Sequence, residues 1–127
     1  MPGVEPAAPG GSGEEAPRAR GDIVIVADRR TQLGSKPRPA VILQNPQFSG
    51  TATVMVCPVT SVTAEAPYLR IALPANQETG LEQLSWAAIE LLGPIRRANV
   101  GRRIGRLDDA TLLAIDRAIL VFLGIAT

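Results

Sequence analysis

The sequence contains no histidine and only one cysteine, Cys57. Histidine is the side chain that most often transfers protons near neutral pH, so any acid–base chemistry must rely on other groups. A single cysteine cannot form an internal disulfide, which is typical of proteins from a reducing cytosol. This composition also disfavours the usual zinc sites, and we expect neither a metal nor another cofactor.

Aromatic residues are scarce, with two Phe, one Tyr and one Trp among 127 residues. RNA-binding domains of the RRM type stack bases on several exposed rings, so the composition argues against that class. The longest apolar run, residues 118–125, is interrupted by Gly124 and is too short to span a bilayer. The first residues also lack the pattern of a signal peptide. We therefore expect a soluble, cytoplasmic protein without a membrane partner.

Residues 1–19 are rich in Pro, Gly, Ala and Glu and contain little that a core could bury. They predict a disordered N-terminal tail. The composition changes abruptly near Gly21, where a β-branched run begins. We expect a single domain over residues 20–127, which is long enough to form a hydrophobic core.

Short β-branched and aliphatic runs separated by brief turns dominate the first part of this domain. Because no connection between them has the length of a helix, they predict an antiparallel, barrel-like sheet and not βαβ units. The runs are “DIVIVA” from Asp22, “AVILQ” from Ala40, “TATVMVCPVTS” from Thr51 and “LRIALP” from Leu69, with “RRIGRL” from Arg102 as a later strand.

The C-terminal segment predicts an amphipathic helix. Asp108 is a suitable N-cap, and Asp109 suits the positive end of the helix dipole. Apolar residues recur at helical spacing until Gly124, on a face made of Leu112, Ile115, Ile119 and Phe122. The fold class expected is α+β, mainly β with a C-terminal helix.

The segment “LEQLSWAAIELL”, residues 81–92, is ambiguous from local rules. Leucine and alanine recur at helical spacing, and Gly93-Pro94 would end a helix, so these rules favour a helix.

Three features each allow a functional and a structural interpretation. Cys57 lies in an apolar run without a histidine to activate it, which favours a small buried hydrophobe over a nucleophile. Trp86 is either an exposed stacking ring or, as is more usual for a lone tryptophan, a residue that packs at the edge of the core. The arginines between positions 96 and 106 either bind phosphates or form a solvated face.

The stretch “GSKPRPAVILQN” places Arg38 between Pro37 and Pro39, directly before a strand. Thr60 and Ser61 follow Pro58 at the end of the next strand. Residues at strand ends can project from a rigid sheet edge into a groove, as a preorganised site requires.

In this order and spacing, the motifs resemble the MazF/PemK family of toxin endoribonucleases, the mRNA interferases of type II toxin–antitoxin systems. The resemblance covers nearly all of residues 20–126. It is carried by “RGDIVIVA”, “GSKPRPAVILQN”, “VMVCPVTS”, “LRIAL”, the Gly80-Leu81 pair and “IGRLDDATLLAIDRAILVFLGIA”.

The resemblance implies a small SH3-like or CcdB–MazF-type antiparallel β-barrel that forms a homodimer. It also implies metal-independent, sequence-specific cleavage of single-stranded RNA, restrained by a cognate antitoxin. It further implies a strand over residues 87–92, which we prefer to the helix that local rules favour.

The family's catalytic arginine and threonine fall on Arg38 and Thr60. RNA-binding residues are expected on the neighbouring segments, at Lys36, Ser35, Ser61, Arg29 and Arg30.

Chemistry supports the assignment of these catalytic roles to Arg38 and Thr60, because the 2′-OH of RNA can itself attack the neighbouring phosphate. A guanidinium matches two phosphate oxygens and stays charged, and a threonine hydroxyl can bind a third. The products would be a 2′,3′-cyclic phosphate and a 5′-OH, and the general base stays open.

Two alternatives also stay open. One is a catalytically degenerate dimeric binding module for an antitoxin peptide or RNA. The other is a toxin on the same barrel that poisons DNA gyrase.

Overall fold

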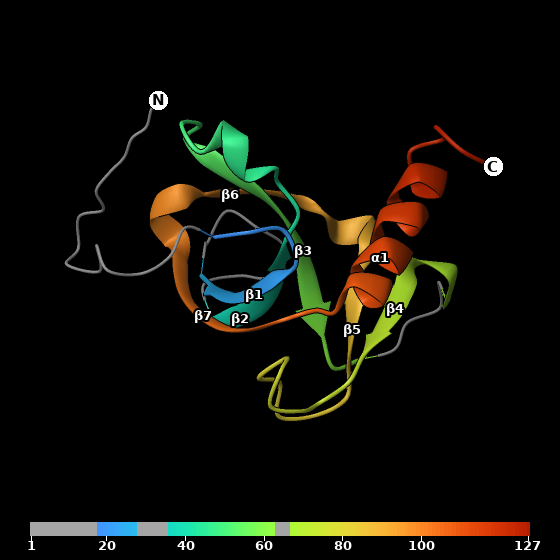
Figure 1. The fold of residues 1–127 in the computed structure, drawn as a ribbon, viewed down its shortest axis with the longest axis horizontal. Coiled ribbons are helices and arrows are strands. Elements are labelled where there is room, and N and C mark those ends of the chain that lie inside the picture. Colours follow the sequence, from blue (N-terminus) through green and yellow to red (C-terminus); the bar gives the residue numbers. More distant parts are fainter. Residues whose placement is uncertain (1–17, 28–35, 63–66) are drawn as a thin grey trace.

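A computed structural model describes residues 18–27, 36–62 and 67–127. The described part of the chain consists mainly of strands and ends in a single α-helix (Figure 1). The strands are β1 Asp22–Val26, β2 Arg38–Ile42, β3 Thr53–Thr60, β4 Arg70–Leu73, β5 Ser85–Ala88, β6 Gly93–Arg96 and β7 Val100–Arg106; the helix is α1 Asp109–Phe122. Short 3-10 helices lie at η1 Pro46–Phe48, η2 Pro67–Leu69, η3 Ile89–Leu91 and η4 Arg97–Asn99.

All pairings between the described strands are antiparallel, in the order β4-β5-β3-β2-β1-β7, with β6 also paired to β3. The long strand β3 joins two parts of the sheet. Its first residues pair with β6 and its middle with β2, whereas Val59 and Thr60 pair with β5. Strands β1, β2, β6 and β7 curl into a barrel on one side of β3, and β4, β5 and α1 lie on the other (Figure 1).

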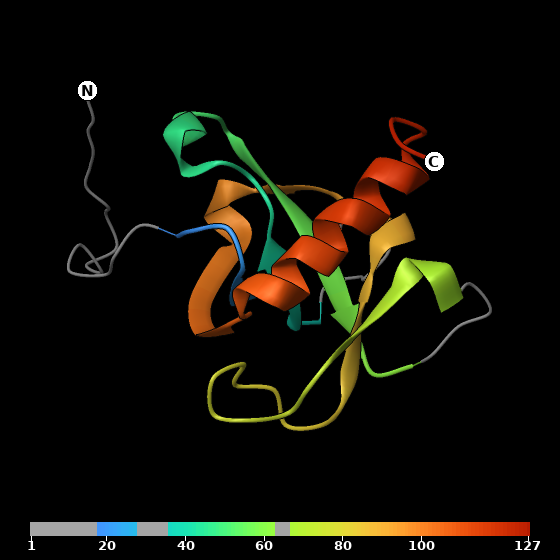
Figure 2. The same ribbon diagram turned by 45° about the vertical axis from the view of Figure 1, so that its right-hand side comes forward.

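Two hydrophobic cores lie on opposite faces of the central strands. One fills the barrel and is made of Val24, Val26, Ala40, Ile42, Val54, Val56 and Ile95. The other lies between the sheet and α1, which crosses β3 in Figure 2, and it includes Ile23, Val41, Cys57, Val59, Leu73, Ala87 and Ile115. Because alternate residues of β1, β2 and β3 enter different cores, these strands are apolar at almost every position. This burial explains the continuous β-branched runs in the sequence.

The expected strands and C-terminal helix are confirmed. The Asp108 side chain caps α1 by accepting a hydrogen bond from the backbone N–H of Thr111 at 2.7 Å. Hydrogen bonding to the side chain and the backbone of Thr111 lowers the pKa of Asp108. Ile115 is fully buried and Leu112 and Ile119 are half-buried, but Phe122 is 42% exposed. The buried face of the helix therefore ends before its last residue.

Residues 81–92 do not form the helix that local rules favour. They contain strand β5, which begins at Ser85 and ends at Ala88, followed by the 3-10 helix η3. A strand is present, as expected, but its bounds differ from the expected residues 87–92. It begins two residues before residue 87 and ends at Ala88. Pairing with β3 and β4 buries Ala87 and outweighs the helical spacing of the leucines.

The N-terminal tail expected over residues 1–19 lies outside the described residues, except for Arg18 and Ala19. Arg18 donates a hydrogen bond to the carbonyl of Gly101 at 2.8 Å, and the backbone N–H of Ala19 donates to Asp22 at 2.8 Å. Within the part of the chain that is described, no helix is long and apolar enough to cross a bilayer.

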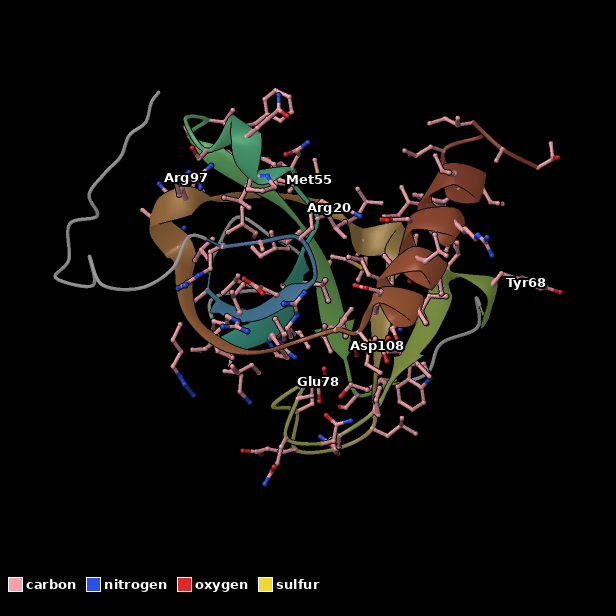
Figure 3. The ribbon with its side chains drawn as sticks, viewed as in Figure 1. Arg20, Met55, Tyr68, Glu78, Arg97 and Asp108 are labelled. Carbon is pink, nitrogen blue, oxygen red and sulfur yellow. The ribbon has the colours of Figure 1, made fainter. Side chains whose placement is uncertain are left out.

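The loop between β4 and β5 crosses strand β7 in close contact. Arg106 donates its backbone N–H to the carbonyl of Glu78 at 2.8 Å, and Figure 3 shows Glu78 on this loop. A Cβ placed on Gly105 would lie 2.2 Å from the carbonyl oxygen of Thr79. Only glycine therefore allows the two backbones to approach this closely.

The substitution Gly105→Ala is expected to destabilise the protein by roughly 1–3 kcal/mol, because the backbone of the crossing loop must move away. Urea unfolding measures the loss. Gly50→Ala is the matched control, since a Cβ at that position meets no atom within 4 Å. Equal stability of the two variants would contradict the close crossing.

Candidate active site at the ends of β2 and β3

Arg38 is the first residue of β2, and its side chain is exposed. It pairs with Val26 of β1, and the next residue, Pro39, pairs with Ile25. The three residues that follow are buried. The two flanking prolines restrict the backbone, and the buried strand anchors it, so the guanidinium projects from a fixed position.

Thr60 is the last residue of β3 and lies at the same end of the sheet as Arg38. The β2–β3 register pairs Ala40 with Pro58, and both Arg38 and Thr60 lie two residues beyond that pair. Side chains alternate along a strand, and paired residues share a face, so Arg38 and Thr60 project from the face that carries Ala40. Since Ala40 belongs to the barrel core, both side chains emerge at the rim of the barrel.

The Thr60 hydroxyl is held by the turn that follows it. Its oxygen accepts a hydrogen bond from the backbone N–H of Val62 at 3.1 Å. A hydroxyl has one proton to donate and can accept two hydrogen bonds. The contact with Val62 therefore orients the oxygen without using its proton, which can still be donated to an acceptor such as a phosphate oxygen.

An ion pair between Arg70 of β4 and Glu90 of η3 supports this turn. The Arg70 Nη1 donates to the carbonyl of Val62 at 3.0 Å, while Nε donates to Glu90 Oε1 at 3.3 Å and Nη2 donates to Glu90 Oε2. The two side chains are only 11% and 25% exposed. A bidentate pair is more rigid than a single contact, so the turn after Thr60 is fixed to two further elements.

The charge on Glu90 is stabilised by this arrangement. The hydrogen bonds from Arg70 hold the pKa of Glu90 below its ordinary value, and they outweigh the opposing effect of partial burial.

The other expected RNA-binding residues are only partly described. Lys36 is exposed two residues before Arg38, and Ser61 is exposed directly after Thr60, so both lie close to the candidate site along the chain. Ser35, Arg29 and Arg30 lie outside the described residues.

The arginine-rich segment near β7 is only in part a free basic surface. Arg103 forms an ion pair with the buried Asp22 at 3.3 Å, and Arg97 donates to the carbonyl of Thr51 at 2.9 Å. Arg102 and Arg106 are exposed. At least two of these arginines thus have a structural role.

Cys57 is fully buried in the core beneath α1. Burial, with a smaller contribution from Glu90, raises the pKa of its thiol to about 12. A thiol with this pKa forms almost no thiolate near neutral pH, which supports the interpretation of Cys57 as a core residue. Among the described residues, no three His, Cys, Asp or Glu side chains lie together as metal ligands would.

Sequence reasoning did not identify the role of Arg70. Its partner Glu90 is 20 residues away along the chain, and only the pairing of β4 with β5 brings them together. An arginine at the start of a strand is typical of a surface residue, and only the strand pairing shows its other role.

Residues 19–123 match the model of a family described as the PemK-like, MazF-like toxins of type II toxin–antitoxin systems. The chain belongs to this family. The toxin is 42% identical over 107 residues to a “Probable endoribonuclease MazF” of Mycolicibacterium smegmatis, a match that covers 84% of this chain and 97% of the relative. It is 32% identical over 114 residues to “Endoribonuclease MazF9” of Mycobacterium tuberculosis, covering 84% and 96%.

The fold of this toxin is also that of solved MazF structures. The MazE–MazF structure from Deinococcus radiodurans superposes with a TM-score of 0.70 at 21% identity, covering 87% of this chain and 100% of the other. The predicted MazF-type barrel with a C-terminal helix is therefore confirmed, as is the resemblance on which it depended.

Removing the charge of Glu90 should lower the stability of the folded protein by an amount that depends on pH. We expect Glu90→Gln to lower the free energy of unfolding by roughly 1–3 kcal/mol at about pH 7, because a charged hydrogen-bonded pair is lost. The folded pKa of Glu90 is depressed, so its stabilisation is present above the unfolded pKa and is lost as pH falls through the folded pKa. The difference between variant and wild type should therefore shrink towards about pH 3.

Urea unfolding at both pH values measures this difference. Glu82→Gln is the control, because Glu82 is exposed and the same charge is removed. A constant difference between Glu90→Gln and wild type across this range would refute the ion-pair account.

Proposed function

We propose that this toxin is a metal-independent, sequence-specific endoribonuclease that cuts single-stranded RNA with Arg38 and Thr60 as its catalytic pair. Its relatives in two mycobacterial species are named endoribonucleases. The observation that carries the proposal is the placement of the two residues at one end and on one face of β2 and β3. A guanidinium and a hydroxyl at the same end and on the same face of two paired strands can bind oxygens of one phosphate group.

The proposed reaction needs no external nucleophile. The 2′ oxygen forms a bond to the adjacent phosphorus while the bond from phosphorus to the 5′ oxygen breaks. The 2′-OH loses its proton to a base that we leave unassigned, and the leaving 5′ oxygen gains one. The products are a 2′,3′-cyclic phosphate and a 5′-OH, and no redox step is involved.

Arg38 would stabilise the negative charge that grows on the phosphate oxygens during attack. A guanidinium presents parallel N–H groups that match two phosphate oxygens. Preorganised donors of this kind are among the largest contributions to catalysis. We also assign Arg38 the donation of a proton to the leaving 5′ oxygen.

Thr60 would donate its hydroxyl proton to a further phosphate oxygen. Its oxygen is already held by the N–H of Val62, and that turn is held by Arg70. The hydroxyl would thus need little reorganisation when RNA binds, which lowers the entropic cost of reaching the transition state.

Lys36 and Ser61 would extend the RNA-binding surface on either side of the catalytic pair, and Ser35, Arg29 and Arg30 would add contacts from the neighbouring segment. We propose that the toxin domain spans residues 20–127, acts as a homodimer in the cytoplasm and is inhibited by a cognate antitoxin. The MazE–MazF complex of Deinococcus radiodurans supports such a partner.

Arg38→Ala and Thr60→Ala should each lower kcat/KM by roughly 100- to 1,000-fold, the usual cost of removing a transition-state hydrogen-bond donor. The assay uses the full chain, a mixed-sequence RNA and EDTA. Thr60→Ser should keep most of the activity because it retains a hydroxyl. Arg117→Ala, which removes an exposed arginine from α1, is the control for loss of charge.

Other results of these assays would favour one of the alternatives or remove a residue from the proposed site. Cleavage by Arg38→Ala at the wild-type rate would remove Arg38 from the site. If the wild type binds RNA but never cuts it, the degenerate binding module is the better description. DNA damage in expressing cells with intact RNA would favour the gyrase-poisoning alternative.

A further inference from the structure

Trp86 is the only tryptophan of the chain and lies in β5, directly across from Thr60. It is half-buried. On its other side it pairs with Ala72 of β4. Thr60, Trp86 and Ala72 therefore form one row across three neighbouring strands.

This row projects from the face of the sheet opposite α1, which is the face that carries Ala40 in β2. Directly paired residues share a face, and the next residue along each strand points to the opposite side. On that opposite side, Val59, Ala87 and Leu73 are all buried in the core beneath α1. Ala72 is exposed, which agrees with an outward direction for the row.

The size of the residues in β5 argues against a purely structural role for Trp86. Its neighbours Ser85 and Ala87 are small and buried, and the buried Ala88 on its own face is small as well, whereas Trp86, the largest side chain of the strand, lies opposite α1 and stays partly exposed. An aromatic ring contributes most to stability when its large apolar surface is fully buried. The small side chains of Thr60 and Ala72 on either side leave the indole partly exposed.

We infer that Trp86 binds RNA by stacking on the base of a nucleotide that borders the scissile phosphate. This inference rests on the proposed function, because it needs the phosphate to lie at Thr60. Neighbouring strands are about 4.8 Å apart, so the ring is within one nucleotide of a phosphate bound by Thr60. Stacking on an indole is favourable for any base and is a common way to hold single-stranded RNA.

Stacking also supplies what the catalytic pair lacks. Arg38 and Thr60 contact only the phosphate, which every nucleotide has, and phosphate contacts position a strand without fixing its bases. A base held at Trp86 would fix the adjacent nucleotide and help to align the 2′ oxygen for attack. Trp86 is therefore a substrate-positioning residue at the catalytic pair.

Fluorescence provides a direct test, since the signal of the only tryptophan reports on this position alone. The probe is a 2′-O-methyl RNA of the sequence that the wild type cuts, which binds but cannot undergo attack by the 2′ oxygen. We expect binding to quench the tryptophan emission. The same probe with an abasic site at each nucleotide bordering the cut should lose the quenching at one of the two positions.

Affinity for the same probes tests the energetic role. Trp86→Ala should weaken binding of the intact probe by about 5- to 150-fold, the range found when a stacking ring is removed. It should weaken binding of the critical abasic probe by much less. Trp86→Phe, which keeps a ring, should bind within a few-fold of the wild type.

Phe48→Ala is the control for loss of an exposed ring. Phe48 is 53% exposed in η1, which follows β2 at the end opposite Arg38, and its removal should leave binding unchanged. Wild-type quenching that persists with both abasic probes would overturn the inference. So would equal affinity of folded Trp86→Ala and wild type for the intact probe.

A purely structural role for Trp86, including one in a subunit interface, is also separable. In that case Trp86→Ala would change stability or oligomeric state, as sedimentation shows, and the wild type would show no base-dependent quenching. The wild-type abasic measurement keeps the test decisive if Trp86→Ala does not fold. Absence of RNA cleavage by the wild type would instead refute the proposed function, whatever the fluorescence shows.

Discussion

The register between β2 and β3 is the constraint on which the candidate site depends. Pairing of Ala40 with Pro58 sets Arg38 and Thr60 at the same end and on the same face. A shift of one residue would turn one of them to the opposite face and separate the guanidinium from the hydroxyl. The register is well fixed, because both faces of these strands are buried in different cores. The two cores therefore serve the site as much as the stability of the fold.

A nuclease without histidine needs another way to assist phosphate chemistry. The proposed site combines the guanidinium cation of Arg38 with the hydroxyl of Thr60, whose oxygen is already oriented by Val62. The Arg70–Glu90 pair extends this support to β4 and η3, so the turn after Thr60 is held from two directions. In the mechanism that we propose, such a site works by electrostatic stabilisation and by positioning, and RNA supplies its own nucleophile.

Much of the fold could be predicted from local sequence. The β-branched runs predicted the main strands, and Asp108 and Gly124 marked the ends of the helical segment. The family motifs also indicated Arg38 and Thr60, which the structure places at the same end of two central strands. Local rules failed where tertiary pairing decides the outcome. Residues 81–92 have helical spacing, but pairing of Ala87 between β3 and β4 makes a strand.

The roles of Trp86 and Arg70 could not be predicted either, because they too depend on tertiary pairing. The position of Trp86 beside Thr60 depends on how β5 pairs with β3, and composition alone favoured packing at the core edge. The role of Arg70 likewise depends on contacts with Val62 and Glu90, which are distant from each other in sequence. Long-range register is thus the information that a single sequence did not provide.

The most direct test of the central claim is a double-mutant cycle on kcat/KM with Arg38→Ala, Thr60→Ala and the combined variant. Groups that act on one phosphate in one transition state are strongly coupled. The account predicts that the combined variant loses about as much activity as the more damaged single variant. If the two losses simply multiply, the residues act independently, and the claim that they form one phosphate site is wrong.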